Sequence, residues 1–343
     1  MSQYSFLDDY SEGCHPDILA ALADTNLVQQ TAYGNDDYSE RARALIREQL
    51  GRRDTPVYFV SGGTLANIII TASALRPHEA IIAASTGHIV GRETGAIEAA
   101  GHKIITVATA DGKLTPEDIR SALANNAHYP HMAKPRLVYI SNATELGTVY
   151  TRAELRALAE SCRANDLLLM LDGARLGVAL TTEASDLTLA EIADLTDIFW
   201  IGGTKAGALI GEAIVIPNAQ LAHEFDFHIK QRGALLAKGR LLGLQFATLF
   251  SGQLFFALSA HANAMAQKIS RAITASGYAL ASPTQSNMIF PILPDALLEK
   301  LHQDYEFHLW SKADDEHAVI RLVTSWATDE EQVNAFIRDI SEK

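Results

Sequence analysis

Short apolar runs alternate with helix-like segments between residues 57 and 201, and this alternation limits the folds open to the chain. Each run is four or five residues long and rich in Val, Ile, Leu and Ala, and amphipathic stretches separate many of the runs. The pattern predicts a mostly parallel sheet that helices cover on both faces, with ligand sites at the carboxyl ends of the strands. The expected strands are 57–60, 80–84, 104–107, 137–140, 167–171 and 198–201, and the expected helices between them are 64–75, 91–100, 116–123 and 152–165.

The segments that flank this core predict two domains. Amphipathic spacing predicts helices at residues 16–31 and 39–50, and an apolar helix-like stretch follows at residues 241–258. The remaining part predicts helices at 259–275 and 329–341 around strands at 288–292 and 319–324, as in a smaller α+β domain. We therefore expect a large α/β domain over residues 1–244 and a small domain over residues 245–343, which the length of 343 residues allows.

Lys205 and Asp172 each follow an apolar run that predicts a buried strand. A lysine and an aspartate at strand ends suit a pyridoxal phosphate (PLP) site, in which the lysine holds the cofactor as a Schiff base and the aspartate pairs with its pyridinium nitrogen. A buried carboxylate needs a positive partner, and Arg175 offers an alternative one as a simple salt bridge. With Lys205 also at a strand end, we favour the cofactor over a purely structural ion-pair network.

Gly62, Gly63 and Thr64 stand where a predicted strand meets a predicted helix. Free backbone N–H groups and the positive end of the helix dipole make this corner a phosphate cradle, although an ordinary strand-to-helix turn has the same residue types. The segment matches neither a Walker loop nor the three-glycine dinucleotide fingerprint.

Two of the twelve histidines are candidates for proton transfer. His88 follows a predicted strand, where an imidazole can stack on a planar ring and exchange protons near neutral pH. His128 lies in a predicted loop and is a possible second proton-transfer group.

Charge and cysteine content exclude several classes of protein. The net charge is −13 and the basic residues are scattered, which argues against binding to nucleic acid or anionic lipid and favours small molecules and other copies of the chain. Cys14 and Cys162 have no metal-ligand spacing, and no metal site is expected. The chain also lacks a signal peptide pattern and a run long enough to span a bilayer, so a cytoplasmic protein is expected.

Taken together, the motifs resemble the threonine aldolases of the aspartate-aminotransferase-like PLP superfamily, over most of the chain. Each segment alone is a weak signal, but the ordered set is specific. The segments that carry the resemblance, in the family's order, are Tyr33-Gly34-Asn35-Asp36, Gly63-Thr64-Leu65-Ala66-Asn67, Gly87-His88, Asp172-Gly173-Ala174-Arg175, Gly202-Gly203-Thr204-Lys205 and Arg321-Leu322-Val323-Thr324.

The resemblance implies a fold type I PLP enzyme with a seven-stranded sheet and shared active sites in a homodimer or homotetramer. It also implies roles for individual residues. Lys205 and His88 are catalytic, with His128 as the family's second histidine; Gly62, Gly63, Thr64, His88, Asp172, Arg175, Lys205 and Arg240 bind the cofactor, Arg240 from a neighbouring subunit; and Asp8, Tyr33, Arg175 and Arg321 bind the amino acid substrate.

Two departures from the family pattern bear on the substrate. Asp8 stands in place of a serine near the substrate carboxylate, which it would repel unless an arginine offsets its charge. The family's Glu-Asn-Thr-His segment is here Ser141-Asn142-Ala143-Thr144-Glu145, without the histidine.

The implied reaction is retro-aldol cleavage of a β-hydroxy-α-amino acid, L-threonine or L-allo-threonine, to glycine and an aldehyde. Either His88 or His128 is expected to remove the β-hydroxyl proton, directly or through water. The alternatives are a PLP-dependent β-eliminating lyase or racemase, and a non-catalytic PLP- or nucleotide-binding α/β protein.

Overall fold

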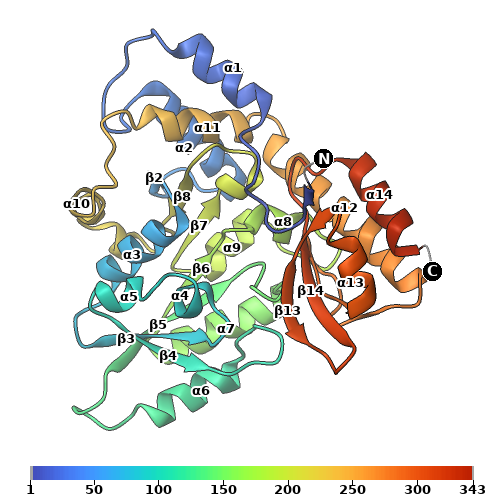
Figure 1. The fold of residues 1–343 in the computed structure, drawn as a ribbon. Coiled ribbons are helices and arrows are strands. Elements are labelled where there is room, and N and C mark those ends of the chain that lie inside the picture. Colours follow the sequence, from blue (N-terminus) through green and yellow to red (C-terminus); the bar gives the residue numbers. More distant parts are fainter. Residues whose placement is uncertain (1–2, 342–343) are drawn as a thin grey trace.

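The computed structural model describes residues 3–341, and a seven-stranded sheet forms its centre. The strand order is β2-β8-β7-β6-β5-β3-β4, and all pairs are parallel except those of β8, which runs antiparallel to β2 and β7. The expected mostly parallel sheet is therefore confirmed (Figure 1). Its strands are β2 Val57–Val60, β3 Glu79–Ala84, β4 Lys103–Val107, β5 Lys134–Ser141, β6 Leu168–Asp172, β7 Ile198–Gly202 and β8 Glu212–Val215.

Helices pack on both faces of this sheet and bury its strands on both sides. Along β3, Ile82 packs into one core while its neighbours Ile81 and Ala83 pack into the other, as the two-residue period of a strand requires. One face holds α3 Gly63–Ala74, α4 His88–Gly91, α5 Ala96–Ala99 and α10 Phe225–Gln231; the other holds α1 Pro16–Thr25, α2 Asp37–Leu50, α6 Pro116–Asn125, α7 Arg152–Ala164, α8 Leu176–Thr181, α9 Leu189–Leu195 and α11 Arg240–Phe250.

The C-terminal elements form a smaller antiparallel sheet with helices and a core of their own. Phe6 belongs to this core, and β1 pairs with β12, so the N-terminal segment lies beside the C-terminal elements (Figure 1). The domain boundary near residue 245 stays a prediction. The elements are β1 Tyr4–Ser5, α12 Leu254–Ala275, β9 Ala279–Leu280, β10 Met288–Ile289, β11 Pro291–Pro294, α13 Asp295–Leu301, β12 Tyr305–Glu306, β13 His308–Lys312, β14 His317–Val323 and α14 Glu330–Ser341.

Three expected helices differ from those observed. The helix expected at residues 16–31 ends at Thr25, and Leu27 beyond it is 92% exposed. The helix expected at 91–100 is two single-turn helices, α4 and α5. The apolar stretch at 241–258 contains the junction of α11 and α12, which meet at 72° around Gly252, a residue with φ of 70°.

Among residues 3–341, no single helix has the length and apolar character to cross a bilayer. Within the same range, only the bent pair of α11 and α12 reaches that length and apolar character in combination.

Candidate active site

Four strands of the large sheet that run in the same direction bring polar side chains together at their carboxyl ends. Asp172 ends β6, Lys205 follows β7 in a single 3₁₀ turn, His88 opens α4 after β3, and Thr64 lies in the first turn of α3 after β2. All four line one cavity of about 190 Å³. The sheet therefore brings together the residues that the sequence analysis placed at strand ends.

Hydrogen bonds hold the Asp172 carboxylate in place. Oδ2 accepts from the Tyr139 hydroxyl at 2.5 Å and from Asn67 Nδ2 at 3.2 Å, and Oδ1 accepts from the Ala174 amide at 3.0 Å. Arg175 forms its ion pair with Asp9 instead. The Asp172–Arg175 salt bridge that the sequence offered as an alternative is therefore not formed among residues 3–341.

Lys205 is embedded in the same cavity, and its surroundings favour the neutral amine. Burial and the Arg175 guanidinium lower the pKa of Lys205, although Asp9, Asp172 and Glu212 act in the opposite direction. A lysine with a lowered pKa has a larger fraction of neutral, nucleophilic amine near neutral pH. Lys205 Nζ lies 5.7 Å from the centroid of the Tyr10 ring.

A chain of hydrogen bonds joins His88 to the Asp172 carboxylate. His88 Nδ1 lies 2.8 Å from Glu93 Oε1, and Asn67 Nδ2 donates to both Glu93 Oε1 at 2.8 Å and Asp172. The Asn67 carbonyl accepts from Trp200 Nε1 at 3.1 Å, which fixes the amide orientation. The Glu93 carboxylate therefore orients the His88 imidazole through its Nδ1 atom.

Two glycines allow the ends of β6 and β7 to approach this closely. A Cβ on Gly173 would lie 1.8 Å from the Trp200 carbonyl oxygen, and one on Gly202 would lie 2.4 Å from that of Ala174. Any larger residue would push the two strand ends apart, and with them Asp172 and Lys205.

The first turn of α3 offers backbone N–H groups to the cavity. Gly62 is its N-cap residue, and no side chain caps the helix. A Cβ on Gly63 would lie 2.7 Å from the Trp200 ring, so this turn packs directly on the indole. An uncapped start of a 12-residue helix is suited to an anionic group.

Arg175 and Arg321 lie at an outer cleft of about 770 Å³ that shares Lys205, His88 and Arg175 with the inner cavity. Arg175 is held by Asp9 through two hydrogen bonds, Nε to Oδ2 at 2.7 Å and Nη2 to Oδ1 at 3.0 Å. Burial raises the pKa of Asp9, but Arg175, Lys205 and hydrogen bonds outweigh this effect and hold it below its usual value.

Arg321 keeps part of its guanidinium available. Nη2 donates to the Leu7 carbonyl at 3.3 Å, and the guanidinium carbon lies 5.4 Å from the Trp310 ring centroid. Its Nε is buried without a hydrogen-bond partner among the described residues. The Arg321 side chain lines the outer cleft, and a guanidinium at a cleft wall suits a carboxylate ligand.

Asp8 does not line the inner cavity or the outer cleft. Its Oδ1 accepts from the Tyr10 amide at 3.0 Å and the Ser11 hydroxyl at 2.9 Å, so the carboxylate closes its own turn. The segment reaches the site through the next two residues instead, because Asp9 pairs with Arg175 and Tyr10 lines the cavity.

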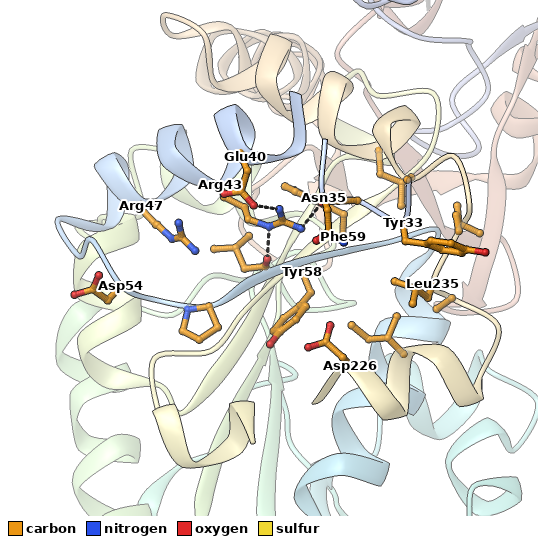
Figure 2. Close-up of a pocket in the computed structure, with 18 residues that line it drawn as sticks. Tyr33, Asn35, Glu40, Arg43, Arg47, Asp54, Tyr58, Phe59, Asp226 and Leu235 are labelled. Carbon is orange, nitrogen blue, oxygen red and sulfur yellow. Dashed lines mark hydrogen bonds and ion pairs between the residues drawn. The ribbon is translucent and has the colours of Figure 1, made fainter. Parts of the chain in front are cut away.

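Tyr33, Arg240 and His128 lie outside the Lys205 cavity and the outer cleft within this chain. Tyr33 borders a separate cavity of about 590 Å³, where Arg43 is held by Glu40 and by backbone carbonyls (Figure 2). Arg240 donates to the carbonyls of Val28 and Thr25, and His128 stands in an exposed loop.

Sequence reasoning missed most of the residues that support the site. Apart from Tyr10, which is 54% exposed, they are buried or half-buried polar side chains that line the cavity or, for Tyr139, donate to Asp172, and their neighbours come from distant parts of the chain. They are Tyr10, Asn67, Glu93, Tyr139, Glu145, Trp200 and Glu212. Burial raises the pKa of Glu212, which receives hydrogen bonds from Gly203 and Thr204 beside Lys205, to about 8.

The chain is similar to known enzymes over nearly its full length. It is 34% identical to the low-specificity L-threonine aldolase of Pseudomonas aeruginosa, over 97% of this chain and 95% of that protein, and 25% identical to that of Saccharomyces cerevisiae, over 80% and 71%. A solved Leishmania major threonine aldolase superposes with a TM-score of 0.97 at 49% identity, and covers 98% of both chains.

More distant structures share the fold alone. Thermus thermophilus aspartate aminotransferase superposes with a TM-score of 0.73 at 16% identity, over 99% of this chain and 91% of the other. This likeness confirms the expected fold type I architecture. The sequence model of the beta-eliminating lyase family matches residues 8–295, and together with the aldolase relatives it shows that the chain belongs to this family of PLP-dependent enzymes.

Proposed function

We propose that this protein is a PLP-dependent carbon–carbon lyase that cleaves L-threonine or L-allo-threonine to glycine and acetaldehyde. One observation carries the proposal. Lys205 and Asp172 face one buried cavity, and Arg175 and Arg321 line the cleft that opens from it. The threonine aldolase relatives over almost the whole chain support the same reaction.

The described residues fit PLP in charge and chemistry. Lys205 Nζ would attach the cofactor, and the Asp172 carboxylate would pair with its pyridine nitrogen. The uncapped start of α3, at Gly62, Gly63 and Thr64, would receive its phosphate. His88, which Glu93 and Asn67 connect to Asp172 through hydrogen bonds, would lie against the ring of the cofactor. When bound, the cofactor withdraws electrons from the substrate Cα.

Two arginines would orient the substrate. Arg175, fixed by Asp9, and Arg321, which also lines the outer cleft, would bind the substrate carboxylate there. This anchoring would place the α-amino group toward Lys205. A carboxylate site beside an amine site suits an α-amino acid as the ligand.

We further propose a homodimer or homotetramer and a cytoplasmic location. Tyr33 and Arg240 have expected roles in a site from which they are remote within this chain, so a neighbouring subunit would have to supply them. Cys14 and Cys162 are buried and free, which suits a reducing compartment.

The proposal is tested by measuring glycine and acetaldehyde release from L-threonine and L-allo-threonine by the purified, PLP-saturated protein. Release from either substrate supports the proposed reaction, and the rate ratio gives the preference at Cβ. Pyruvate or 2-oxobutyrate from β-substituted amino acids, without aldehyde, would replace it with β-elimination.

A variant of Lys205 tests the cofactor attachment independently. Lys205→Ala is expected to lose both turnover and the cofactor's visible absorbance after dialysis, whereas Lys103→Ala, at an exposed lysine on β4, should keep both. A coloured and active Lys205→Ala protein would contradict the assignment.

A further inference from the structure

Glu145 is a carboxyl group at the junction of the two cavities, and no role described so far uses it. It lines the inner cavity with Lys205 and the outer cleft with Arg321. A substrate that reaches Lys205 with its amine and Arg321 with its carboxylate has to cross this junction. The β-carbon of the substrate is bonded to the same Cα, so its hydroxyl lies within reach of the junction walls.

The two described hydrogen bonds to Glu145 end on the same oxygen. Oε1 accepts from the His88 amide at 2.9 Å and from the Ser141 hydroxyl at 2.7 Å. Oε2 receives no hydrogen bond from another residue between positions 3 and 341. One oxygen therefore fixes the orientation of the carboxyl group, and the other is left for a ligand.

His88 is less suited to the β-hydroxyl than its place in the cavity suggests. Its Nδ1 is occupied by Glu93. A ring that also lay against the planar cofactor would keep only Nε2 for proton exchange. Glu145 has no such second function, and His128 is outside the cavity.

The surroundings of Glu145 adjust its proton affinity toward neutral pH. Burial and then the Asp172 carboxylate raise the pKa of Glu145, while hydrogen bonds from Ser141 and His88 lower it, with a net rise. A carboxylate with a raised pKa is a stronger base than an exposed one. The charged or titratable groups that face it are His88, Tyr139, Tyr150, Asp172 and Arg175, and Tyr10 and Lys205 line the same cavity.

We propose that Glu145 is the catalytic base that takes the proton from the substrate's β-hydroxyl group. The inference rests on the proposed function. The proton passes to Oε2, the O–H electron pair becomes the second bond of the aldehyde carbonyl, and the Cα–Cβ bond breaks with its pair left on Cα. The same proton is then available to Cα, so glycine and aldehyde form without a further acid or base.

Glu145→Gln tests the role of the charge. Glutamine keeps an oxygen for the His88 and Ser141 hydrogen bonds but cannot take the proton. We expect kcat to fall by about 10²–10⁴-fold with cofactor absorbance and thermal stability retained. The matched control is Glu154→Gln, at a glutamate that pairs with Lys113 at the start of α7, which should keep wild-type kcat.

Ser141→Ala tests the same residue through its pKa. Loss of the hydroxyl removes a hydrogen bond that lowers the pKa of Glu145, so the acid limb of the kcat/KM profile, which reports the free enzyme, should move to higher pH. Infrared difference spectroscopy of the PLP-loaded protein, without substrate, should show a carboxylic acid band that titrates in the same pH range. This band should be absent in Glu145→Gln and shifted upward in pH in Ser141→Ala.

The outcomes separate this inference from the proposed function. If the wild-type protein releases aldehyde and Glu145→Gln does so within about tenfold of its kcat, Glu145 is not the base. A carboxyl titration that does not coincide with the acid limb would also overturn the inference. If the wild-type protein releases no aldehyde from either substrate, the proposed function fails and this inference fails with it.

Discussion

At the scale of single residues, the site depends on a buried carboxylate that accepts hydrogen bonds on both oxygens. Tyr139 and Asn67 donate to Oδ2 of Asp172, and the Ala174 amide donates to Oδ1. A charged group in this position can stabilise a protonated ring nitrogen, whereas a neutral amide cannot.

Asp172→Asn should therefore keep the fold and lower the activity. The amide keeps one oxygen for hydrogen bonding but removes the charge, so we expect kcat to fall at least about 100-fold. Steady-state kinetics with the PLP-saturated variant measures the loss, and thermal unfolding checks that the protein is intact. Turnover equal to wild type would remove Asp172 from its assigned role.

The strand-end residues could be predicted from sequence because a strand end is a local feature. Lys205, Asp172 and His88 each follow an apolar run, and the parallel sheet brings those runs to one edge. Their partners could not be predicted in this way. Glu145 approaches His88 across 57 positions, and Asp9 approaches Arg175 across 166, and no local pattern records such contacts.

At the scale of elements, the close approach of the ends of the parallel strands β6 and β7 sets the distance between Asp172 and Lys205. Gly173 occupies a position where a Cβ would lie 1.8 Å from the Trp200 carbonyl oxygen, which belongs to the neighbouring strand. Backbone atoms cannot move aside as the end of a flexible side chain can.

Gly173→Ala should destabilise the protein by about 1–3 kcal/mol and weaken PLP retention, because the strand ends must separate. Chemical denaturation and cofactor absorbance after dialysis measure the two effects. Gly13→Ala is the control, since a Cβ added at Gly13 would have no atom of another residue within 4 Å beyond its chain neighbours. Equal stability of the two variants would show that the strands tolerate the added methyl group.

The element pattern was predictable where periodicity was strong and failed where strands or helices were short. Strand β8, only four residues long, was not expected, although it carries Glu212 and is the one antiparallel member of the sheet. Gly252, with its positive φ, separates α11 from α12 within an apolar stretch whose sequence predicts a single helix. Hydropathy alone does not record such a break.

The N-terminal segment links the two parts of the chain through Asp9. This carboxylate is 1% exposed and contacts Arg175 and Asn287, which lie far apart in the sequence. Removal of its charge would leave the Arg175 guanidinium buried without a counter-charge. We expect Asp9→Asn to lose about 3–5 kcal/mol of unfolding free energy.

The pH dependence of this loss follows from the lowered pKa of Asp9. Its contribution to stability is complete above the unfolded value of about 3.9 and is lost as the pH falls through the lower folded value. The difference between wild type and Asp9→Asn should therefore shrink only in strong acid. Urea denaturation at several pH values measures it, and a difference that vanishes near neutral pH would contradict the ion pair.

At the scale of the whole molecule, three residues with expected roles lie outside the cavity in which they would act. Arg240 is engaged with the carbonyls of Val28 and Thr25, Tyr33 borders the separate cavity of Figure 2, and His128 is in an exposed loop. Exposed apolar side chains lie near Tyr33 and Arg240 in the sequence, including Leu27 and Phe227. Remote site residues and exposed apolar side chains both favour association with a second copy of the chain.

Subunit mixing tests whether Arg240 acts in the site of a neighbouring subunit. Lys205→Ala and Arg240→Ala should each be inactive or nearly so, because one lacks the cofactor attachment and the other the proposed phosphate contact. In a mixed dimer, one of the two sites has an intact Lys205 from one chain and an intact Arg240 from the other. Random reassembly in equal amounts should then restore about one quarter of wild-type activity, since half of the dimers are mixed and each has one complete site. If Arg240 serves its own chain, every site carries one of the two defects and mixing restores nothing.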